Sequence, residues 1–141
     1  MPSVSARRRP LTAAGKLRLL ARSWSSFGRL MLWRRRHELP ALVDVILREP
    51  RRPLPYDVRP VRAGRIVVRS LEAGPVHARC LTNALVHLRI LHQQGEDPVL
   101  ALGLPELAPS KDAHAWVELD GRDVGPPPGR GVNEALVRYP G

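Results

Sequence analysis

A helical repeat begins at Cys80, the single cysteine of the chain, and it limits the architectures that the chain can adopt. The repeat places apolar residues along one side of a helix, at Leu81, Ala84, Leu85, Leu88 and Leu91. Gly95 then stands where helices commonly end. The pattern predicts a helix over residues 80–94, whose apolar side must be covered by another element.

Strand and turn signals follow this helix. Residues 99–102 form a short apolar run that Gly103 is expected to end, and residues 113–119 read as a second strand. Asp120-Gly121 is a two-residue hairpin signal, so residues 122–125 are expected to return antiparallel. This order of elements predicts an α+β fold, in which the helix that carries Cys80 packs on a small antiparallel sheet.

The first part of the chain predicts a helical extension. Residues 11–36 carry one apolar stripe with arginines on the other side, and the stripe consists of Leu17, Leu20, Trp24, Phe27 and Met31. We expect this helix to pack on the core, and a helix that docks a partner or a membrane surface is the alternative. A second helix is expected over residues 40–48, before a connector rich in proline and arginine.

These signals divide the 141 residues into a basic helical extension, residues 1–55, and a core, residues 56–141. Residues 1–10 are expected to be disordered. Residues 61–71 are compatible with a strand or a helix, because β-branched residues lie in a window that tolerates both. Asn133 is expected to cap a last short helix over residues 134–139.

Charge is distributed unevenly along the chain. Residues 1–70 hold 17 Lys and Arg against 4 Asp and Glu, whereas the whole chain has a net charge of +10. A basic half suggests an acidic partner, although a GC-rich genome would also enrich arginine. With one cysteine and no evident secretory signal, we expect a reduced, cytoplasmic setting without stable membrane insertion.

Cys80 and His114 carry the predicted chemistry. A thiolate at a helix start is stabilised by free backbone N–H groups and the helix dipole, and Arg79 adds a positive charge. His114 opens the following strand, on which His114, Trp116 and Glu118 share one face. Taken singly, a lone cysteine or histidine is more often structural. Together they follow the order in which a cysteine nucleophile and its histidine base occur in papain-like and transglutaminase-like hydrolases.

The stretch CLTNAL at residues 80–85, with Gly95 and HAWVELDG at residues 114–121, resembles the lasso peptide leader peptidases. More narrowly, it is similar to the stand-alone protease half of the split maturation protein, over about residues 75–125. The resemblance implies a transglutaminase-like, papain-related fold and removal of the leader from a ribosomally made precursor peptide. It also implies two protein partners, a small leader-recognition protein and an ATP-dependent lasso cyclase.

The chain departs from this family at the third catalytic position. The family has an aspartate about a dozen residues after the histidine, where this chain has Pro126. The hairpin would pair Asp123 with Glu118, four residues along from His114, and about 13 Å is too far for a hydrogen bond. Asn133 is the candidate third member, because papain-like enzymes use asparagine there.

Three further expectations concern ligands. Trp116 is expected to line the substrate site and to pack on the Cys80 helix. His87 and His92 are spaced by five residues on that helix, which suits one metal ion poorly, so we expect no zinc site and no cofactor. No nucleic-acid motif is present, and nucleic acid is not expected as a partner.

Two alternative functions remain open at this point. The first is a basic binding module with an inactive site, which affinity for nucleic acid that falls steeply with salt would favour. The second is an acyl transferase or amidase of the same fold, which would pass through the same thioester.

Overall fold

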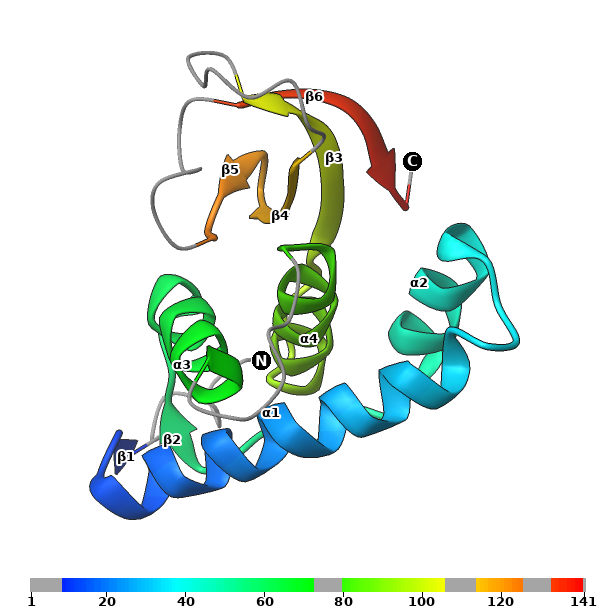
Figure 1. Cartoon of the computed structure of the whole chain (residues 1–141). Helices are drawn as coiled ribbons and strands as arrows, with labels where there is room; N and C mark the ends of the chain where they lie inside the picture. The colour runs from blue at the N-terminus through cyan, green and yellow to red at the C-terminus, as the bar shows by residue number, and fades with distance from the viewer. Residues whose placement is uncertain (1–8, 73–79, 106–113, 126–132, 141) are drawn as a thin grey trace.

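The computed structural model describes residues 9–72, 80–105, 114–125 and 133–140. Helix α1 runs along one edge, α3 and α4 pack against it, and a sheet lies on the opposite side of these two helices (Figure 1). The helices are α1 (Ala13–Trp33), α2 (Leu39–Arg48), α3 (Pro60–Glu72) and α4 (Cys80–Gln93). The main sheet contains β3 (Val99–Pro105), β4 (His114–Leu119), β5 (Arg122–Asp123) and β6 (Asn133–Tyr139). A short parallel pair joins β1 (Arg9–Pro10) to β2 (Tyr56–Asp57).

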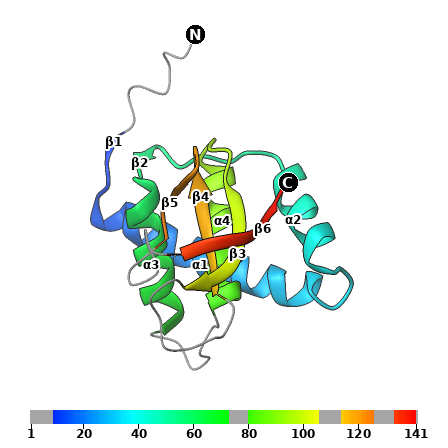
Figure 2. The same cartoon turned by 90° about the horizontal axis from the view of Figure 1, so that it is seen from above.

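The main sheet has the order β5-β4-β3-β6, and every neighbouring pair is antiparallel. Seen from above, β3 and β4 overlie α4 (Figure 2), with which both strands are in contact. The hairpin turns at Asp120 and Gly121, both with positive φ (52° and 78°), as a tight two-residue turn requires. The predicted α+β class, with the helix that begins at Cys80 packed on an antiparallel sheet, is confirmed.

Two predictions about segments of the sheet were wrong. Gly103 does not end β3, which continues to Pro105, and the pairing of β3 with β6 shifts register between Leu102 and Gly103. A glycine inside a strand often marks such an irregularity. The predicted helix after Asn133 is instead strand β6. A run of seven residues is too short for its periodicity to separate strand from helix, and the free edge of β3 supplies the backbone partners.

Helix α1 was predicted correctly, but its core-facing side was not. The buried side consists of Gly15, Leu19, Ser23, Ser26 and Leu30. Trp24 and Phe27 pack only at the edge of the core, while Leu17 and Leu20 are exposed. The small residues allow close approach: a Cβ on Gly15 would lie 3.1 Å from the Tyr56 ring.

Helix α2 was predicted correctly, and the ambiguous segment 61–71 forms most of α3. Ala63, Val67 and Leu71 follow one another at steps of four residues on α3, and all three are buried. One cluster of buried side chains includes residues from α1 to α4 and from the sheet. The helices before residue 55 therefore share this cluster with the rest of the described chain, and the predicted division near residue 55 stays a prediction. Within the described residues, no helix combines the length and the apolarity that a bilayer span needs.

Candidate active site

Helix α4 and strand β4 bring the backbones of Cys80 and His114 to the same end of the fold. Cys80 is the first residue of α4, and His114 is the first residue of β4. Only residues 94–98 join α4 to β3, so β3 runs back alongside the helix toward its N-terminus. His114 pairs with Gly103 near the far end of β3. The contact between the Cys80 and His114 side chains lies outside the described part of the structure and stays a prediction.

Asn133, the candidate third member, begins β6 and pairs with Pro105. It therefore lies toward the same end of the sheet as His114, but two strands away and offset by two residues along β3, which is about 12 Å between backbones. Its role stays a prediction, and Pro126, like Arg79, falls outside the described residues. The predicted pairing of Glu118 with Asp123 is confirmed.

Trp116 is buried, and its indole N–H donates to Glu118 Oε2 at 3.1 Å. Arg138 Nε donates to the other carboxylate oxygen of Glu118 at 2.8 Å. The neighbours of Trp116 on β4, Ala115 and Val117, belong to the core cluster that includes α4. Because side chains alternate along a strand, Trp116 lies on the opposite face of β4 from Ala115 and Val117. Its expected packing on the Cys80 helix stays a prediction. Its predicted part in substrate binding is not tested by this arrangement.

Arg34 brings a positive charge to the first turn of α4. It follows the last residue of α1, and its Nη1 donates to Thr82 Oγ1 at 3.3 Å. Thr82 is buried two residues after Cys80. A guanidinium at this place adds to the positive end of the helix dipole and favours an anion there. The sequence contains no signal that singles out Arg34 within its run of three arginines.

We therefore expect Arg34→Gln to slow alkylation of Cys80 by iodoacetamide near neutral pH by about two- to fivefold, because the thiolate fraction falls. The rate is read from loss of free thiol, since Cys80 is the single cysteine. Arg35→Gln is the matched control, because Arg35 is the next residue along and makes no hydrogen bond to α4 among the described residues. Equal rates for the two variants would contradict this role of Arg34.

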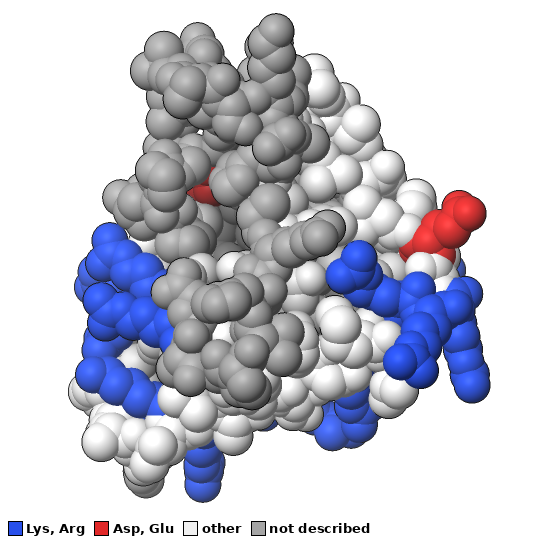
Figure 3. Space-filling view, in the orientation of Figure 1, with Lys and Arg blue, Asp and Glu red and all other residues white. Residues whose placement is uncertain are grey.

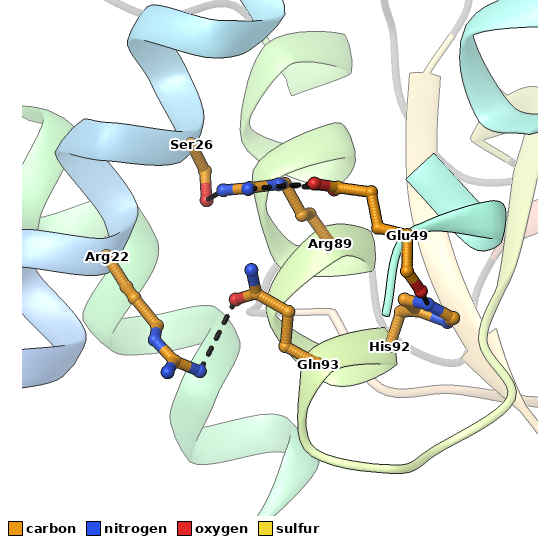
Figure 4. Close-up of polar contacts among 6 residues, drawn as sticks. All are labelled: Arg22, Ser26, Glu49, Arg89, His92 and Gln93. Carbon is orange, nitrogen blue, oxygen red and sulfur yellow. Dashed lines mark hydrogen bonds and ion pairs between the residues drawn. The ribbon is translucent and has the colours of Figure 1, made fainter. Parts of the chain in front are cut away.

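A largely buried ion pair joins α4 to the end of α2. Arg89 donates from Nε to Glu49 Oε1 at 2.7 Å and from Nη2 to Glu49 Oε2 at 3.1 Å. The Arg89 Nη1 group donates to Ser26 Oγ at 2.6 Å, and the guanidinium lies 5.8 Å from the centre of the Trp33 ring. These contacts join α4 to α1 and to the end of α2 (Figure 4). Sequence reasoning missed this pair, although an arginine among the leucines of the predicted helix was a usable signal.

The connector between α2 and α3 is bound to α4 by polar side chains. Glu49 accepts at its backbone oxygen from His92 Nε2 at 2.7 Å, and Gln94 Oε1 accepts from Leu54 N at 2.6 Å. Arg22 on α1 reaches the same region and donates to Gln93 Oε1 at 3.4 Å (Figure 4). The part of the chain predicted as an extension therefore supports the helix that carries Cys80.

His87 lies on α4 and is buried against α3. Its Nε2 lies 2.8 Å from the Pro60 carbonyl oxygen, and a Cβ on Gly64 would lie 2.8 Å from its Cε1. Burial lowers the pKa of His87 from 6.5 to about 4, although the hydrogen bond to Pro60 acts in the opposite direction. His87 is therefore neutral at physiological pH and has a structural position.

This pKa predicts that the protein loses stability in mild acid. Because the folded pKa lies below the unfolded one, the unfolded chain binds the proton more readily. Neutral His87 contributes fully to the free energy of unfolding above the unfolded pKa. This contribution is lost as pH falls toward the folded pKa, by about 2 kcal/mol between about pH 7 and pH 5. Urea unfolding at the two pH values measures it. His87→Gln should remove most of this pH dependence, and an unchanged dependence would contradict the assignment.

Among the described residues, no group of three or more His, Cys, Asp or Glu is arranged to hold a metal ion. The sequence profile of the transglutaminase-like superfamily matches residues 17–135, a range that contains both Cys80 and His114. Comparison with curated proteins and with solved structures gives no significant match. Because the profile covers most of the chain and agrees with a helix that begins at cysteine and packs on an antiparallel sheet, the chain belongs to the transglutaminase-like superfamily.

Proposed function

We propose that this protein is a cysteine peptidase that removes the leader from a ribosomally made lasso precursor peptide. The observation that carries the proposal is the shared location of two chain positions, the first residue of α4 and the first residue of β4. Cysteine and histidine at these positions are the nucleophile and the base that a reaction through a thioester needs. Membership of the transglutaminase-like superfamily supports this class of reaction. The likeness of CLTNAL and HAWVELDG to the leader peptidases supports the substrate.

In this mechanism Cys80 is the nucleophile and His114 is the general base. His114 takes the thiol proton, and Cys80 Sγ forms a bond to the scissile carbonyl carbon. The carbon–nitrogen bond breaks, the core peptide leaves as an amine with the proton from His114, and the leader remains as a thioester. Water then attacks the thioester with His114 again as base, which releases the leader as a carboxylic acid. The backbone N–H groups of the first turn of α4 are candidate donors to the oxyanion.

Substrate recognition in a domain of this size is expected to be shared. We propose that the leader-recognition protein presents the precursor to this chain. The ATP-dependent cyclase then closes the ring on the released core peptide. Asn133 is proposed to orient His114, and Trp116 is proposed to line the site.

The test is cleavage of a precursor peptide by the purified chain together with the leader-recognition protein, followed by mass spectrometry. We expect two fragments, a leader with a free carboxylate and a core peptide with a free amine. Added hydroxylamine should convert part of the leader to a hydroxamate, because it intercepts a thioester. Cleavage that persists after alkylation of Cys80 would contradict the proposal.

The same assay separates hydrolysis from acyl transfer. Acyl transfer is the second candidate, because transglutaminases, after which the superfamily is named, transfer an acyl group to an amine. If the leader carboxyl group is recovered joined to an added primary amine and not as the free acid, the chain is an acyl transferase. Free acid as the main product in the presence of that amine supports the peptidase.

A further inference from the structure

Helix α1 exposes apolar side chains on the side that faces away from the core. Leu17, Leu20 and Leu32 are 66%, 43% and 64% exposed. They are three of the five large apolar side chains that are exposed within the described residues. We define the outer stripe of α1 as Leu17, Leu20, Ala21, Met31 and Leu32, of which Met31 is half-buried. At 3.6 residues per turn, this stripe lies about 160° around the helix from the buried side.

The position of α1 leaves this stripe accessible. Helices α3 and α4 pack on the opposite side of α1, which forms one edge of the molecule (Figure 1). In Figure 4, Arg22 and Ser26 extend from α1 toward α4, which is the inner side of the helix. From Leu17 to Leu32 the outer stripe is about 22 Å long at 1.5 Å per residue. It therefore presents a long apolar edge to whatever lies outside.

Positive charges flank the outer stripe on both sides. Lys16 lies on one side of it, and Arg18 and Arg29 lie on the other, at 100° per residue. All three are exposed and have no hydrogen-bond or ion-pair partner among the described residues. Residues 11–37 contain no Asp or Glu. The helix thus combines leucines across its outer side with unpaired cations at the borders.

We propose that the outer stripe of α1 binds the surface of an anionic lipid bilayer, with α1 parallel to the plane of the membrane. Leucine side chains would enter the boundary between headgroups and acyl chains, and the flanking cations would contact lipid phosphates. This inference is independent of the proposed peptidase activity, because it concerns another face of the molecule.

The distribution of charge favours a bilayer over other occupants. A second copy of the chain would bring the same cations against one another, because an isologous contact pairs identical surfaces. Nucleic acid would match the cations and would leave the leucines uncovered. Cations also lie on the outer side of α3, at Arg62, Arg65 and Arg69, and in the turn after α1 (Figure 3), so the positive charge extends beyond the outer stripe. An extended anionic surface attracts all of them.

The test is co-sedimentation of the full chain with vesicles of phosphatidylglycerol and phosphatidylcholine, against vesicles of phosphatidylcholine alone. We expect binding to the mixed vesicles that weakens with salt. The triple variant L17S/L20S/L32S and the charge variant K16Q/R18Q/R29Q should each lower the partition coefficient by at least about tenfold. Both sets of residues are exposed, and circular dichroism checks that each variant keeps the fold.

The matched control is the variant L136S/V137S, which removes the other two exposed apolar side chains, on β6. It should bind the mixed vesicles within about twofold of the unsubstituted chain. The proposal is overturned if the chain binds the two vesicle types equally, or binds neither. It is also overturned if L17S/L20S/L32S binds as well as the control, or if that variant converts a dimer to a monomer without any vesicle binding by the parent chain.

Discussion

Replacement of Cys80 by alanine is expected to abolish leader cleavage, with a loss of at least about 10³-fold in kcat/KM. The enzyme would lose the thiol that attacks the peptide bond, and no thioester could form. Alanine is a good helix former, so α4 should still begin at this position and the unfolding transition should stay close to that of the parent chain. The measurement is the initial rate of leader release, with mass spectrometry to detect the slow residual product.

His114→Ala is expected to be equally damaging, and the double variant should be no slower than either single variant. Nucleophile and base act as one unit, so their effects do not add. His37→Ala is the control for loss of a histidine, because His37 lies in the turn after α1 and has no part in the proposed chemistry. If His114→Ala retained more than about a tenth of the activity while Cys80→Ala had none, the base would have to be sought elsewhere.

The elements that sequence reasoning found are those with local signals. The helix that begins at Cys80 ends near Gly95, whose φ of 99° is the left-handed conformation that glycine adopts readily. The Asp120-Gly121 turn was also predicted correctly, because both residues tolerate positive φ. Signals of this kind act over a few residues. They predicted the order of elements from α4 to β5. That order, with Cys80 and His114 at its two key positions, indicated the superfamily.

What sequence reasoning missed depends on contacts between distant residues. The buried side of α1 is marked by Gly15, Ser23 and Ser26, which are small or polar, so an apolar pattern does not reveal them. Gly15 leaves room for the Tyr56 ring, and Ser26 accepts a hydrogen bond from Arg89. Strand β6 exists because the edge of β3 pairs with it. The positions of Cys80 and His114 could be named from the chain, whereas the contribution of Arg34 at Thr82 could not, because it needs the end of α1 to reach α4.

Removal of either partner of the Arg89–Glu49 pair is expected to cost about 3–5 kcal/mol of the free energy of unfolding. The side chains of Arg89 and Glu49 are only 7% and 18% exposed. Arg89→Met would leave the Glu49 carboxylate and the Ser26 hydroxyl buried without this donor. Glu49→Leu would leave the guanidinium without its carboxylate. A loss of this size is a large part of the stability of a typical domain, 5–15 kcal/mol.

The double variant, Arg89→Met with Glu49→Leu, distinguishes the interaction between the two charges from the contribution of the surrounding residues. It should recover most of the loss, because two apolar side chains leave no buried charge unpaired. The exposed pair between Arg51 and Asp97, at 40% and 91% exposure, is the control, and Asp97→Ala should cost less than about 1 kcal/mol. Urea unfolding followed by circular dichroism gives all four values. A double variant as unstable as the sum of the single ones would mean that the two charges do not depend on each other, and that α4 is held at this junction by packing alone.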